Sequence, residues 1–253
     1  MGAHNIETKE TRLTSLLVDG VLAIDAGGLS SALSLSEQEG IKTVLLTHHH
    51  FDHTRDLVTL CFNNANLWHH EIQVYALKQT LDVIIPCLLD GKIYVNLIEY
   101  PSAEKIYLRL NTIEPYRKEL IAEYQVLALP VEHSVPTIAY QITSSDGKSL
   151  FYTGDTGPGL FHCWQHISPH LIFTEVSAPN KFTDAVSGIG HLSSLLLKEE
   201  LIQFKQLRGY LPRIVVIHIG IPYEQEIKKE VAQVAEELGA DISLGYEGMK
   251  VTL

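Results

Sequence analysis

The first part of the chain alternates short apolar runs with turn residues. Residues 16–18 and 21–24 are apolar and flank Asp19-Gly20, a pair typical of a tight β-hairpin turn. Residues 41–46 form another apolar run, rich in β-branched side chains, which stops at Thr47-His48 and favours a buried strand. The pattern therefore predicts that a hairpin and a third strand open the fold.

Strand and helix patterns alternate along the rest of the chain. Runs of strand length and composition lie at residues 74–76, 124–129, 137–143, 149–153, 171–174 and 213–217. Helical spacing begins at residue 56 and is found again over residues 77–89, 160–167, 193–207 and 224–238. Because strand–helix alternation recurs in both halves, with hairpins inside each half, we expect an α+β fold. Its expected architecture is an αββα sandwich of two mixed β-sheets flanked by helices.

Length and composition favour a folded chain. The 253 residues, 45% of them hydrophobic, suffice for a buried core in one large domain or two small ones. No repeat, low-complexity tract or Pro/Gly/Ser-rich linker divides the sequence. We therefore expect residues 1–253 to form a single domain.

The charge and the cysteine content indicate which partners and which cellular compartment are expected. Nineteen Lys and Arg against thirty Asp and Glu give a net charge of −11, which disfavours a protein that coats nucleic acid. The three cysteines form no CxxC pair, which fits a reducing compartment. No N-terminal segment joins a basic start to an apolar stretch, and no apolar run reaches the roughly 18 residues that span a bilayer. We expect a cytoplasmic protein without a membrane partner.

Histidine is unusually frequent, with 13 residues, and four of them lie in one short segment. At the end of a strand, side chains two positions apart point the same way, so His48 and His50 can bind one metal ion while His49 faces elsewhere. Asp52 and His53 follow in the turn and can serve a second ion. Solvated loops and expression tags also contain histidine runs, but this run follows a buried strand and includes an aspartate, which favours metal binding.

Further metal-competent side chains follow other apolar strands. His133, Asp155 and His218 each come after such a run, and glycines around Asp155 permit a tight loop. Taken alone, His133 or His218 is better explained as an ordinary capping or core residue. Together the three repeat one pattern, a buried strand that ends in a possible ligand, and four residues cannot complete two metal sites. The joint pattern favours metal binding.

The pattern His-x-His-x-Asp-His, formed by residues 48–53, resembles the metallo-β-lactamase superfamily, and the resemblance spans nearly the whole chain. It implies a dinuclear centre with one metal ion bound by His48, His50 and His133, the other by Asp52, His53 and His218, and both by Asp155. Asp25-Ala26-Gly27 is similar to the family's early Asp-x-Gly, which supports the metal-binding loop. The implied cofactors are two divalent ions, with Zn²⁺ expected and Mn²⁺ or Fe²⁺ as alternatives, because nitrogen and oxygen ligands accept all three.

Other segments resemble two phosphodiester-cleaving branches of that family. Residues 152–158, 174–180, 190–193 and 216–219 are similar to class II cyclic-nucleotide phosphodiesterases and to tRNA 3′-end endonucleases. In the latter, a Glu and a His beyond the metal ligands assist cleavage, and Glu175 and His191 match that pair. The resemblance implies attack by a metal-bound hydroxide that Asp52 orients, with His191, held by Glu175, as general acid. The alternative for His191 is a solvated or capping role at a helix start.

We therefore expect a metal-dependent phosphoric diester hydrolase. Its expected substrate is a small anionic phosphodiester, with a 3′,5′-cyclic nucleotide as the leading candidate. One alternative is an endoribonuclease of the tRNA 3′-end type, and another is a non-catalytic metal-binding sensor module. Residues 103–118, the candidate counterpart of the basic arm of tRNA endonucleases, carry Lys105, Arg109, Arg117 and Lys118 but also Glu104 and Glu114. With the net charge of −11, long nucleic acid is the less favoured substrate.

Three further expectations concern the chain's surroundings. Exposed apolar helices and the habit of the family make a homodimer a reasonable expectation. Ser193 begins a predicted helix whose exposed N–H groups could accept phosphate oxygens, and plain N-capping by Ser193 is the alternative. Family members begin with a strand before a glycine, whereas this chain begins Met1-Gly2, which leaves open a missing strand or a misassigned start.

Overall fold

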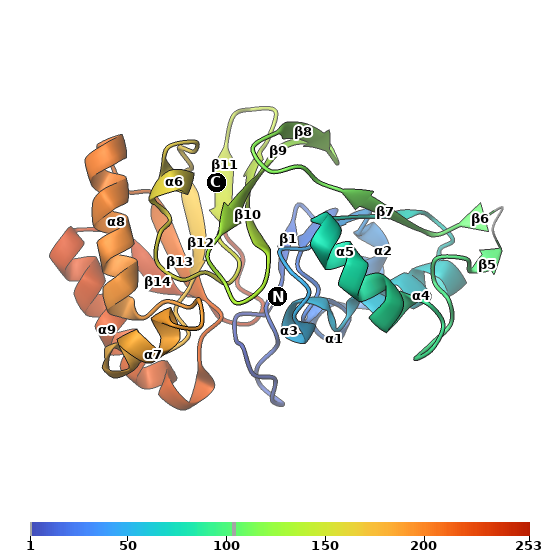
Figure 1. The fold of residues 1–253 in the computed structure, drawn as a ribbon, viewed down its shortest axis with the longest axis horizontal. Coiled ribbons are helices and arrows are strands. Elements are labelled where there is room, and N and C mark those ends of the chain that lie inside the picture. The colour runs from blue at the N-terminus through green and yellow to red at the C-terminus, as the bar shows by residue number, and fades with distance from the viewer. Residues whose placement is uncertain (1, 103–104) are drawn as a thin grey trace.

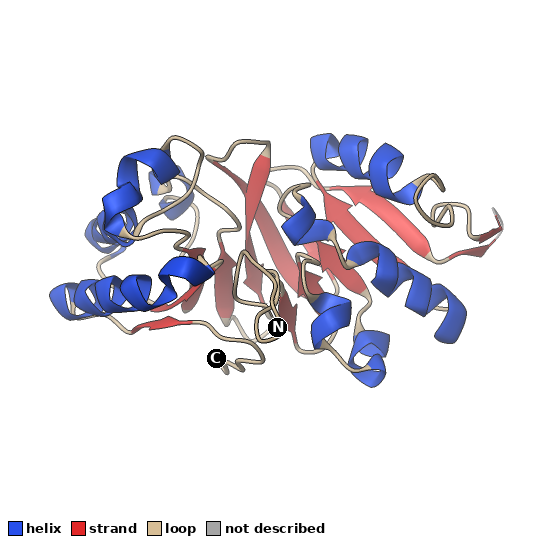
Figure 2. Cartoon of the chain, turned by 90° about the horizontal axis from the view of Figure 1, so that it is seen from below, coloured by secondary structure: helices blue, strands red, loops and turns tan. Residues whose placement is uncertain are grey.

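The computed structural model describes residues 2–102 and 105–253, so Met1, Ala103 and Glu104 lie outside the described residues. Two β-sheets lie face to face in the middle of the molecule, and helices cover their outer sides (Figures 1 and 2). Helices α8 (Ser194–Arg208) and α9 (Glu224–Leu238) cover one side, and α4 (Leu57–Leu67) and α5 (Lys78–Ile84) the other. The expected αββα sandwich is confirmed.

The first sheet is built from the N-terminal part of the chain. Its strand order is β1 (Leu16–Val18), β2 (Leu22–Ile24), β3 (Thr43–Leu45), β4 (Ile72–Ala76) and β7 (Leu108–Thr112). The β1–β2 pair is the predicted hairpin, and the other neighbours are parallel. The short helices α1 (Leu29–Ala32), α2 (Leu35–Gly40) and α3 (Phe51–Thr54) belong to this half, and α5 continues into a π-helical turn at Ile85–Leu89.

The second sheet contains the C-terminal strands. In order across the sheet they are β14 (Ile242–Leu244), β13 (Arg213–Ile217), β12 (Leu171–Glu175), β11 (Ser149–Tyr152), β10 (Thr137–Thr143), β9 (Tyr124–Val131) and β8 (Lys118–Ile121). Strands β8 to β11 pair antiparallel, whereas β11 to β14 are parallel. The remaining elements are α6 (Phe161–Trp164), α7 (Thr183–Ser187), two 3₁₀ turns at Asn180–Phe182 and Ile221–Tyr223, and a small ribbon of β5 (Pro101–Ser102) and β6 (Lys105–Ile106).

Strand β9 shows why both faces of the second sheet are buried. Val126 and Ala128 point into the core between the two sheets, whereas Leu127 and Leu129 point into the core beneath α6 and α8. Successive side chains of a strand point to opposite faces, so an uninterrupted apolar run is suited to a sheet that is covered twice. This accounts for the lack of polar alternation in the sequence of β9.

The candidate basic segment contributes sheet edges. Arg109 lies in β7, the end strand of the first sheet, and its guanidinium donates to both carboxylate oxygens of Glu71 at 2.9 and 2.8 Å. Lys118 begins β8, the end strand of the second sheet. Neither strand was predicted, because polar residues interrupt the apolar ones in LRLNT and leave only two apolar residues in KELI. Ala103 and Glu104 of the same segment lie outside the described residues.

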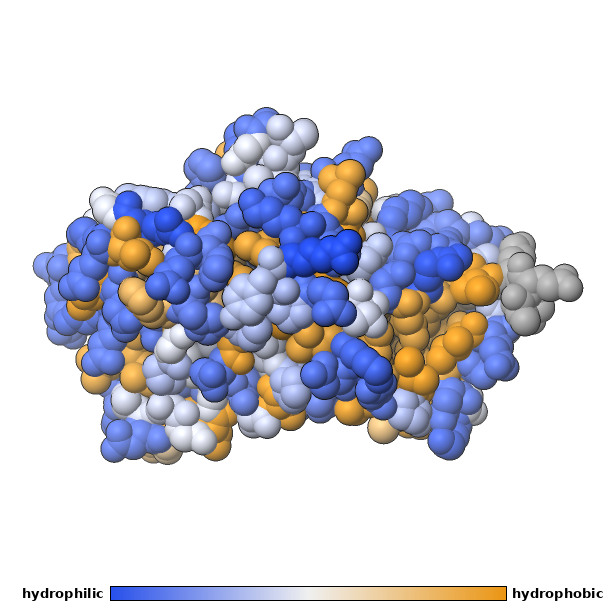
Figure 3. Space-filling model, turned by 45° about the horizontal axis from the view of Figure 1, so that its top comes forward, coloured by the Kyte–Doolittle hydropathy of each residue, from blue (hydrophilic) through white to orange (hydrophobic). Residues whose placement is uncertain are grey.

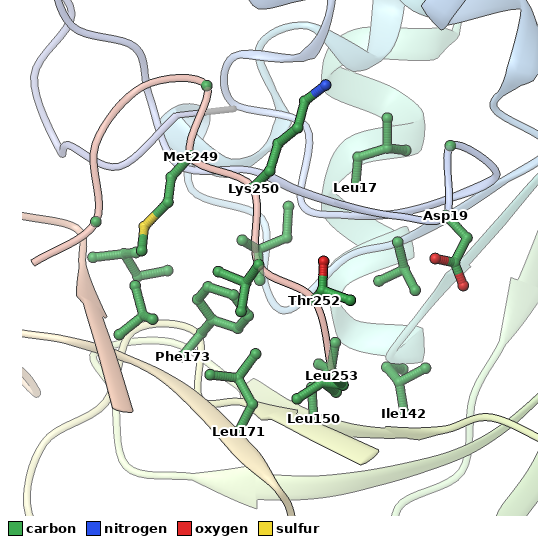
Figure 4. Close-up of a pocket in the computed structure, with 18 of the residues that line it drawn as sticks. Leu17, Asp19, Ile142, Leu150, Leu171, Phe173, Met249, Lys250, Thr252 and Leu253 are labelled. Carbon is green, nitrogen blue, oxygen red and sulfur yellow. The ribbon is translucent and has the colours of Figure 1, made fainter. Parts of the chain in front are cut away.

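A cavity of about 920 Å³ opens at the β1 side of the sandwich. Figure 4 shows Leu150, Leu171 and Phe173 of the second sheet on one side of it and Leu17 of β1 on the other, with the C-terminal residues 249–253 between them. None of the predicted metal or catalytic residues lines this cavity. The predicted chemistry therefore belongs to a different part of the molecule.

Apolar side chains also lie at the surface of the molecule. Hydrophilic side chains predominate on the face in Figure 3, and hydrophobic ones gather near the end that carries the β5–β6 ribbon. Ile93 and Leu67 are among the exposed apolar residues, at 74% and 52%. Within the described residues, no helix is both long and apolar enough to cross a membrane. The homodimer and the cytoplasmic location remain predictions.

Two buried tyrosines connect the sheets next to the histidine-rich segment. The Tyr140 hydroxyl of β10 donates to the Leu46 carbonyl at 2.9 Å, and the Tyr152 hydroxyl of β11 donates to the Asp25 carboxylate at 2.8 Å. Both hydroxyls reach from the second sheet to loops that follow strands of the first. These two bonds hold the second sheet against the first, close to the start of the histidine-rich segment.

Replacing Tyr140 by Phe should lower the free energy of unfolding by about 1–3 kcal/mol, because the buried Leu46 carbonyl loses its tyrosine donor. Urea denaturation monitored by circular dichroism measures the change. Tyr210→Phe is the matched control, since that hydroxyl bonds the Pro169 carbonyl near the surface and its loss should cost about 0.5 kcal/mol or less. Equal losses in the two variants would contradict the role given to Tyr140.

Candidate metal centre

The predicted ligands lie where strands of the two sheets end. The segment that carries His48, His50, Asp52 and His53 follows β3, and α3 begins directly after His50. His133 follows β9, Asp155 follows β11 and His218 follows β13. Because the carboxyl ends of parallel strands lie on the same edge of a sheet, these loops converge on one region. The structure brings all seven side chains together.

The first group consists of His48, His50, His133 and Asp155, whose donor atoms all lie within 4.8 Å of one another. The Nδ1 atom of His50 is 3.0 Å from Nε2 of His48 and 3.2 Å from Nε2 of His133. The Nε2 atoms of His48 and His133 are each 3.9 Å from Oδ2 of Asp155. These are the residues that the resemblance assigns to one ion and to the bridge.

The second group consists of Asp52, His53, Asp155 and His218, again within 4.8 Å. Asp155 Oδ1 lies 3.2 Å from His53 Nε2, and Asp155 Oδ2 lies 3.3 Å from His218 Nε2. The Nε2 atom of His218 is also 3.3 Å from Asp52 Oδ2. Asp155 thus belongs to both groups, as a bridging ligand must, and the ligand roles remain predictions.

The other ring nitrogen of each of four histidines has its own partner in the protein. The pairs are His48 Nδ1 with Thr47 Oγ1 at 2.9 Å, His53 Nδ1 with Asp25 Oδ2 at 2.7 Å, His133 Nδ1 with the Gly190 carbonyl at 2.9 Å, and His218 Nδ1 with Ser177 Oγ at 2.8 Å. Such bonds fix the ring orientation of a metal-binding histidine. They leave Nε2 of all four rings directed at the two groups.

Two buried atoms support the fit of a cation. His53 Nε2 and Asp155 Oδ1 are buried without a hydrogen-bond partner. They lie 3.2 Å apart, but their relative orientation does not make a hydrogen bond. Unpaired buried polar atoms are costly, and a divalent ion would supply a partner for both. The donor set of imidazole nitrogens and carboxylate oxygens therefore fits two divalent ions.

The electrostatic surroundings keep most of these donors available. Burial lowers the pKa of His48 well below its ordinary value and also lowers the pKa values of His50 and His133, so the neutral, metal-binding form of each ring is favoured. Burial raises the pKa of Asp155, but His218 and His53 outweigh it and hold the pKa well below the usual range. For His53, burial lowers the pKa, while Asp155 and Asp25 raise it well above normal overall. The two carboxylates thus favour positive charge at His53, whereas burial favours the neutral form of the other three rings.

Glu175 and His191 lie beside these groups. Glu175 ends β12, is fully buried, and its Oε1 atom is 2.7 Å from His191 Nδ1. The His191 ring stacks on that of His218 at 5.5 Å and meets that of His133 edge-on at 4.9 Å. Burial lowers the pKa of His191, but the Glu175 carboxylate outweighs it and raises the pKa to about 9. The structure brings the predicted pair together, and its catalytic role remains a prediction.

Left-handed backbone and glycines allow these loops to approach one another. Gly154 has a φ of +62°, and a Cβ there would lie 2.9 Å from the side chain of Thr47; Gly190 has a φ of +79°, and a Cβ there would lie 2.5 Å from the Cα of His133. His218 itself has a φ of 54°, uncommon for a non-glycine residue. Strain of this kind is often found at functional sites.

The N-terminus of α8 is capped by side chains. Ser193 Oγ accepts the N–H of Leu196 at 3.4 Å, and Asn180 Oδ1 accepts that of Leu195 at 2.7 Å. The capping alternative for Ser193 is therefore what the structure shows. Sequence reasoning missed Thr47, Tyr152 and Ser177, because a single hydroxyl in a sequence carries no signal of which histidine or carboxylate it will meet.

Metal content should separate the predicted ligands from His191. The wild-type protein is expected to bind about two equivalents of Zn²⁺, and Asp155→Ala should lose binding at both groups because its carboxylate belongs to each. His191→Ala should keep the wild-type stoichiometry. Metal analysis after dialysis against buffered zinc measures all three proteins. Equal metal loss in the two variants would refute the separation of roles.

Comparison with known proteins shows the family to which the chain belongs. Residues 14–219 match a family described as the β-lactamase superfamily domain. Among curated proteins, an octanoyltransferase of Porphyromonas gingivalis is 31% identical over 223 residues, 85% of this chain, but the chain spans only 38% of that protein's length.

Solved structures with the same fold include unliganded yeast PDE1, with a TM-score of 0.80 and 17% identity over 98% of this chain and 96% of that one. The metallo-β-lactamase fold protein YhfI of Bacillus subtilis has a TM-score of 0.73 and 17% identity, covering 98% and 95%. The short form of human tRNase Z has a TM-score of 0.70 and 16% identity, covering 99% and 96%. At these identities the likeness shows the fold, and with the family match over most of the sequence, the chain belongs to the β-lactamase superfamily in its metallo-β-lactamase fold.

Proposed function

We propose that this protein is a dinuclear metal-dependent phosphodiesterase that hydrolyses a small nucleotide diester, with a 3′,5′-cyclic nucleotide as the expected substrate. The observation that carries the proposal is the Glu175–His191 pair, placed beside two groups of metal-competent side chains that share Asp155. A metal-binding module without catalysis has no need of a histidine held in this position. The shared fold of yeast PDE1 supports the same choice.

The residues that would hold the ions fall into two sets. His48, His50 and His133 would bind one ion, Asp52, His53 and His218 the other, and Asp155 both. Two such ions supply Lewis-acid stabilisation of a phosphodiester and a nucleophilic water at neutral pH. We propose Zn²⁺, while Mn²⁺ and Fe²⁺ suit the same donor atoms.

Asp52 and His191 are the predicted reacting residues that solvent can reach. Their side chains are 31% and 17% exposed, whereas the side chains of His53 and Glu175 are fully buried. This exposure supports the proposal that the Asp52 carboxylate orients the attacking hydroxide. Because His191 Nδ1 is bonded to Glu175, its Nε2 is the nitrogen that can donate a proton to the leaving oxygen.

Charge supports a small substrate. The net charge is −11, and Arg109 of the candidate basic segment is paired with Glu71. Long RNA carries many phosphates and depends on many cationic contacts, whereas a cyclic nucleotide carries one phosphate. The fold shared with human tRNase Z keeps an endoribonuclease as the second candidate. Acyl transfer, named for the Porphyromonas gingivalis relative, is not proposed, because the match covers only 38% of that protein.

His191→Ala should slow hydrolysis of cyclic AMP by about 10²–10⁴-fold, because an alkoxide leaving group needs a proton. The loss should be much smaller with bis(p-nitrophenyl) phosphate, whose p-nitrophenolate leaves without one. Steady-state rates with both substrates, at matched metal content, measure the difference. His166→Ala is the control, since His166 is exposed and contacts the ring of Tyr116 instead of the site. An equal loss on both substrates would contradict the general-acid role.

Substrate choice separates the two enzyme proposals. We expect the zinc-loaded protein to hydrolyse cyclic AMP faster than it cleaves a precursor tRNA, and a chelator should abolish both activities. Product analysis by chromatography and by gel electrophoresis measures the two rates. Faster tRNA cleavage would reverse the ranking. Absence of turnover on either substrate, and on bis(p-nitrophenyl) phosphate, with metal bound would leave the sensor alternative.

A further inference from the structure

Ser177 lies between the predicted proton donor and the predicted metal ligands. It follows β12 by two residues, and its backbone N–H donates to the Leu192 carbonyl at 3.1 Å. Its Oγ atom lies 2.7 Å from Glu175 Oε2, 2.8 Å from His218 Nδ1 and 3.4 Å from His191 Nδ1. On His218 the hydroxyl contacts Nδ1, whereas Nε2 of the same ring lies 3.3 Å from Asp155.

The hydroxyl has one proton, and its contacts decide where that proton goes. A buried carboxylate accepts only, so Ser177 donates to Glu175. The same oxygen must then accept the N–H of His218 Nδ1. With the proton on Nδ1, the lone pair of His218 is on Nε2, the atom that lies 3.3 Å from both Asp155 and Asp52. The hydroxyl that bridges Glu175 and His218 therefore orients His218 Nε2 toward Asp155 and Asp52.

Glu175 connects the two functions through its two oxygens. Oε1 receives the N–H of His191 at 2.7 Å and the backbone N–H of Thr156 at 2.8 Å. Oε2 receives the Ser177 hydroxyl and the backbone N–H of Leu192 at 3.3 Å. The carboxylate is fully buried, so these donors hold it in one orientation. The Glu175 carboxylate therefore holds both His191, directly, and His218, through Ser177.

The other half of the site contains the same arrangement. Thr47 Oγ1 lies 2.9 Å from His48 Nδ1 and donates to the Asp25 carboxylate at 2.9 Å, while Asp25 binds His53 Nδ1 directly. In both halves a buried carboxylate holds one histidine directly and a second through a hydroxyl. The recurrence in unrelated loops indicates that the hydroxyl has a positioning role.

We infer that Ser177 is a positioning residue that fixes His218 for the second metal ion and ties that ion's ligand to the Glu175–His191 pair. The inference rests on the proposed dinuclear centre. Loss of the hydroxyl leaves His218 Nδ1 without its acceptor, so the ring can turn or exchange its proton to Nε2. Loss of such an outer partner typically lowers metal affinity about 10–100-fold.

The test is a zinc titration against a competing chelator, with no substrate present. Ser177→Ala should weaken one of the two zinc sites about 10–100-fold and leave the other within about twofold. Ser177→Thr keeps the hydroxyl and should restore the affinity. Thr183→Ala is the matched control from the same region, since that hydroxyl bonds the Asn180 carbonyl and Ser193. Thermal unfolding of each apoprotein confirms that the variants fold.

A double-mutant cycle separates positioning from a general structural effect. If Ser177 acts through His218, adding Ser177→Ala to His218→Ala should cause no further loss of zinc affinity. An additive loss, equal weakening of both sites, or unchanged affinity in Ser177→Ala would overturn the inference. Since the readout is zinc alone, a wild type that binds two ions but hydrolyses no phosphodiester would refute the proposed function and leave the role of Ser177 intact.

Discussion

The metal centre depends on the buried carboxylate of Asp25. It accepts the backbone N–H of Thr47 at 2.8 Å, the Thr47 hydroxyl, His53 Nδ1 at 2.7 Å and the Tyr152 hydroxyl at 2.8 Å. An ionised group without solvent is tolerated only when its oxygens are fully bonded. Three of these donors belong to Thr47 and His53, in the loop that carries the histidines, and the fourth belongs to Tyr152 of the opposite sheet. The carboxylate therefore sets the loop's position relative to the second sheet.

This constraint couples metal binding to sheet packing. His48, His50 and His53 follow a strand of the first sheet, whereas His133, Asp155 and His218 follow strands of the second. A small displacement of one sheet would separate donor atoms that now lie within 4.8 Å. Ions that bind only this arrangement must stabilise the packed sandwich by mass action. Conversely, the cross-sheet bonds of Tyr140 and Tyr152 organise the site before an ion binds.

The local pattern of apolar and polar residues was enough to predict the main strands and helices and the positions of the candidate ligands. The strands at 137–143 and 213–217 and the helix at 224–238 have the predicted bounds. A short apolar run rich in β-branched residues indicates a buried strand, and apolar residues spaced by 3 or 4 indicate an amphipathic helix. The seven predicted ligands converge because each follows such a strand. The short polar strand β7, the hydroxyl of Ser177 and the Gly190 carbonyl beneath His133 were not predictable in this way. Gly190 is 57 residues from His133 in sequence, so only the folded chain shows that contact.

The acidic charge and an anionic substrate are compatible because the two act over different ranges. Exposed carboxylates are screened by salt within about 8–10 Å, whereas a cation among buried ligands acts on a group that contacts it. Burial lowers the pKa values of His53 and His191, but neighbouring carboxylates outweigh it and raise both, so positive charge is favoured at these two rings. A phosphodiester small enough to enter would meet this local field at contact distance. Under the proposed function, a long polyanion would also have to bring its remaining phosphates against a chain of net charge −11, which favours a small substrate.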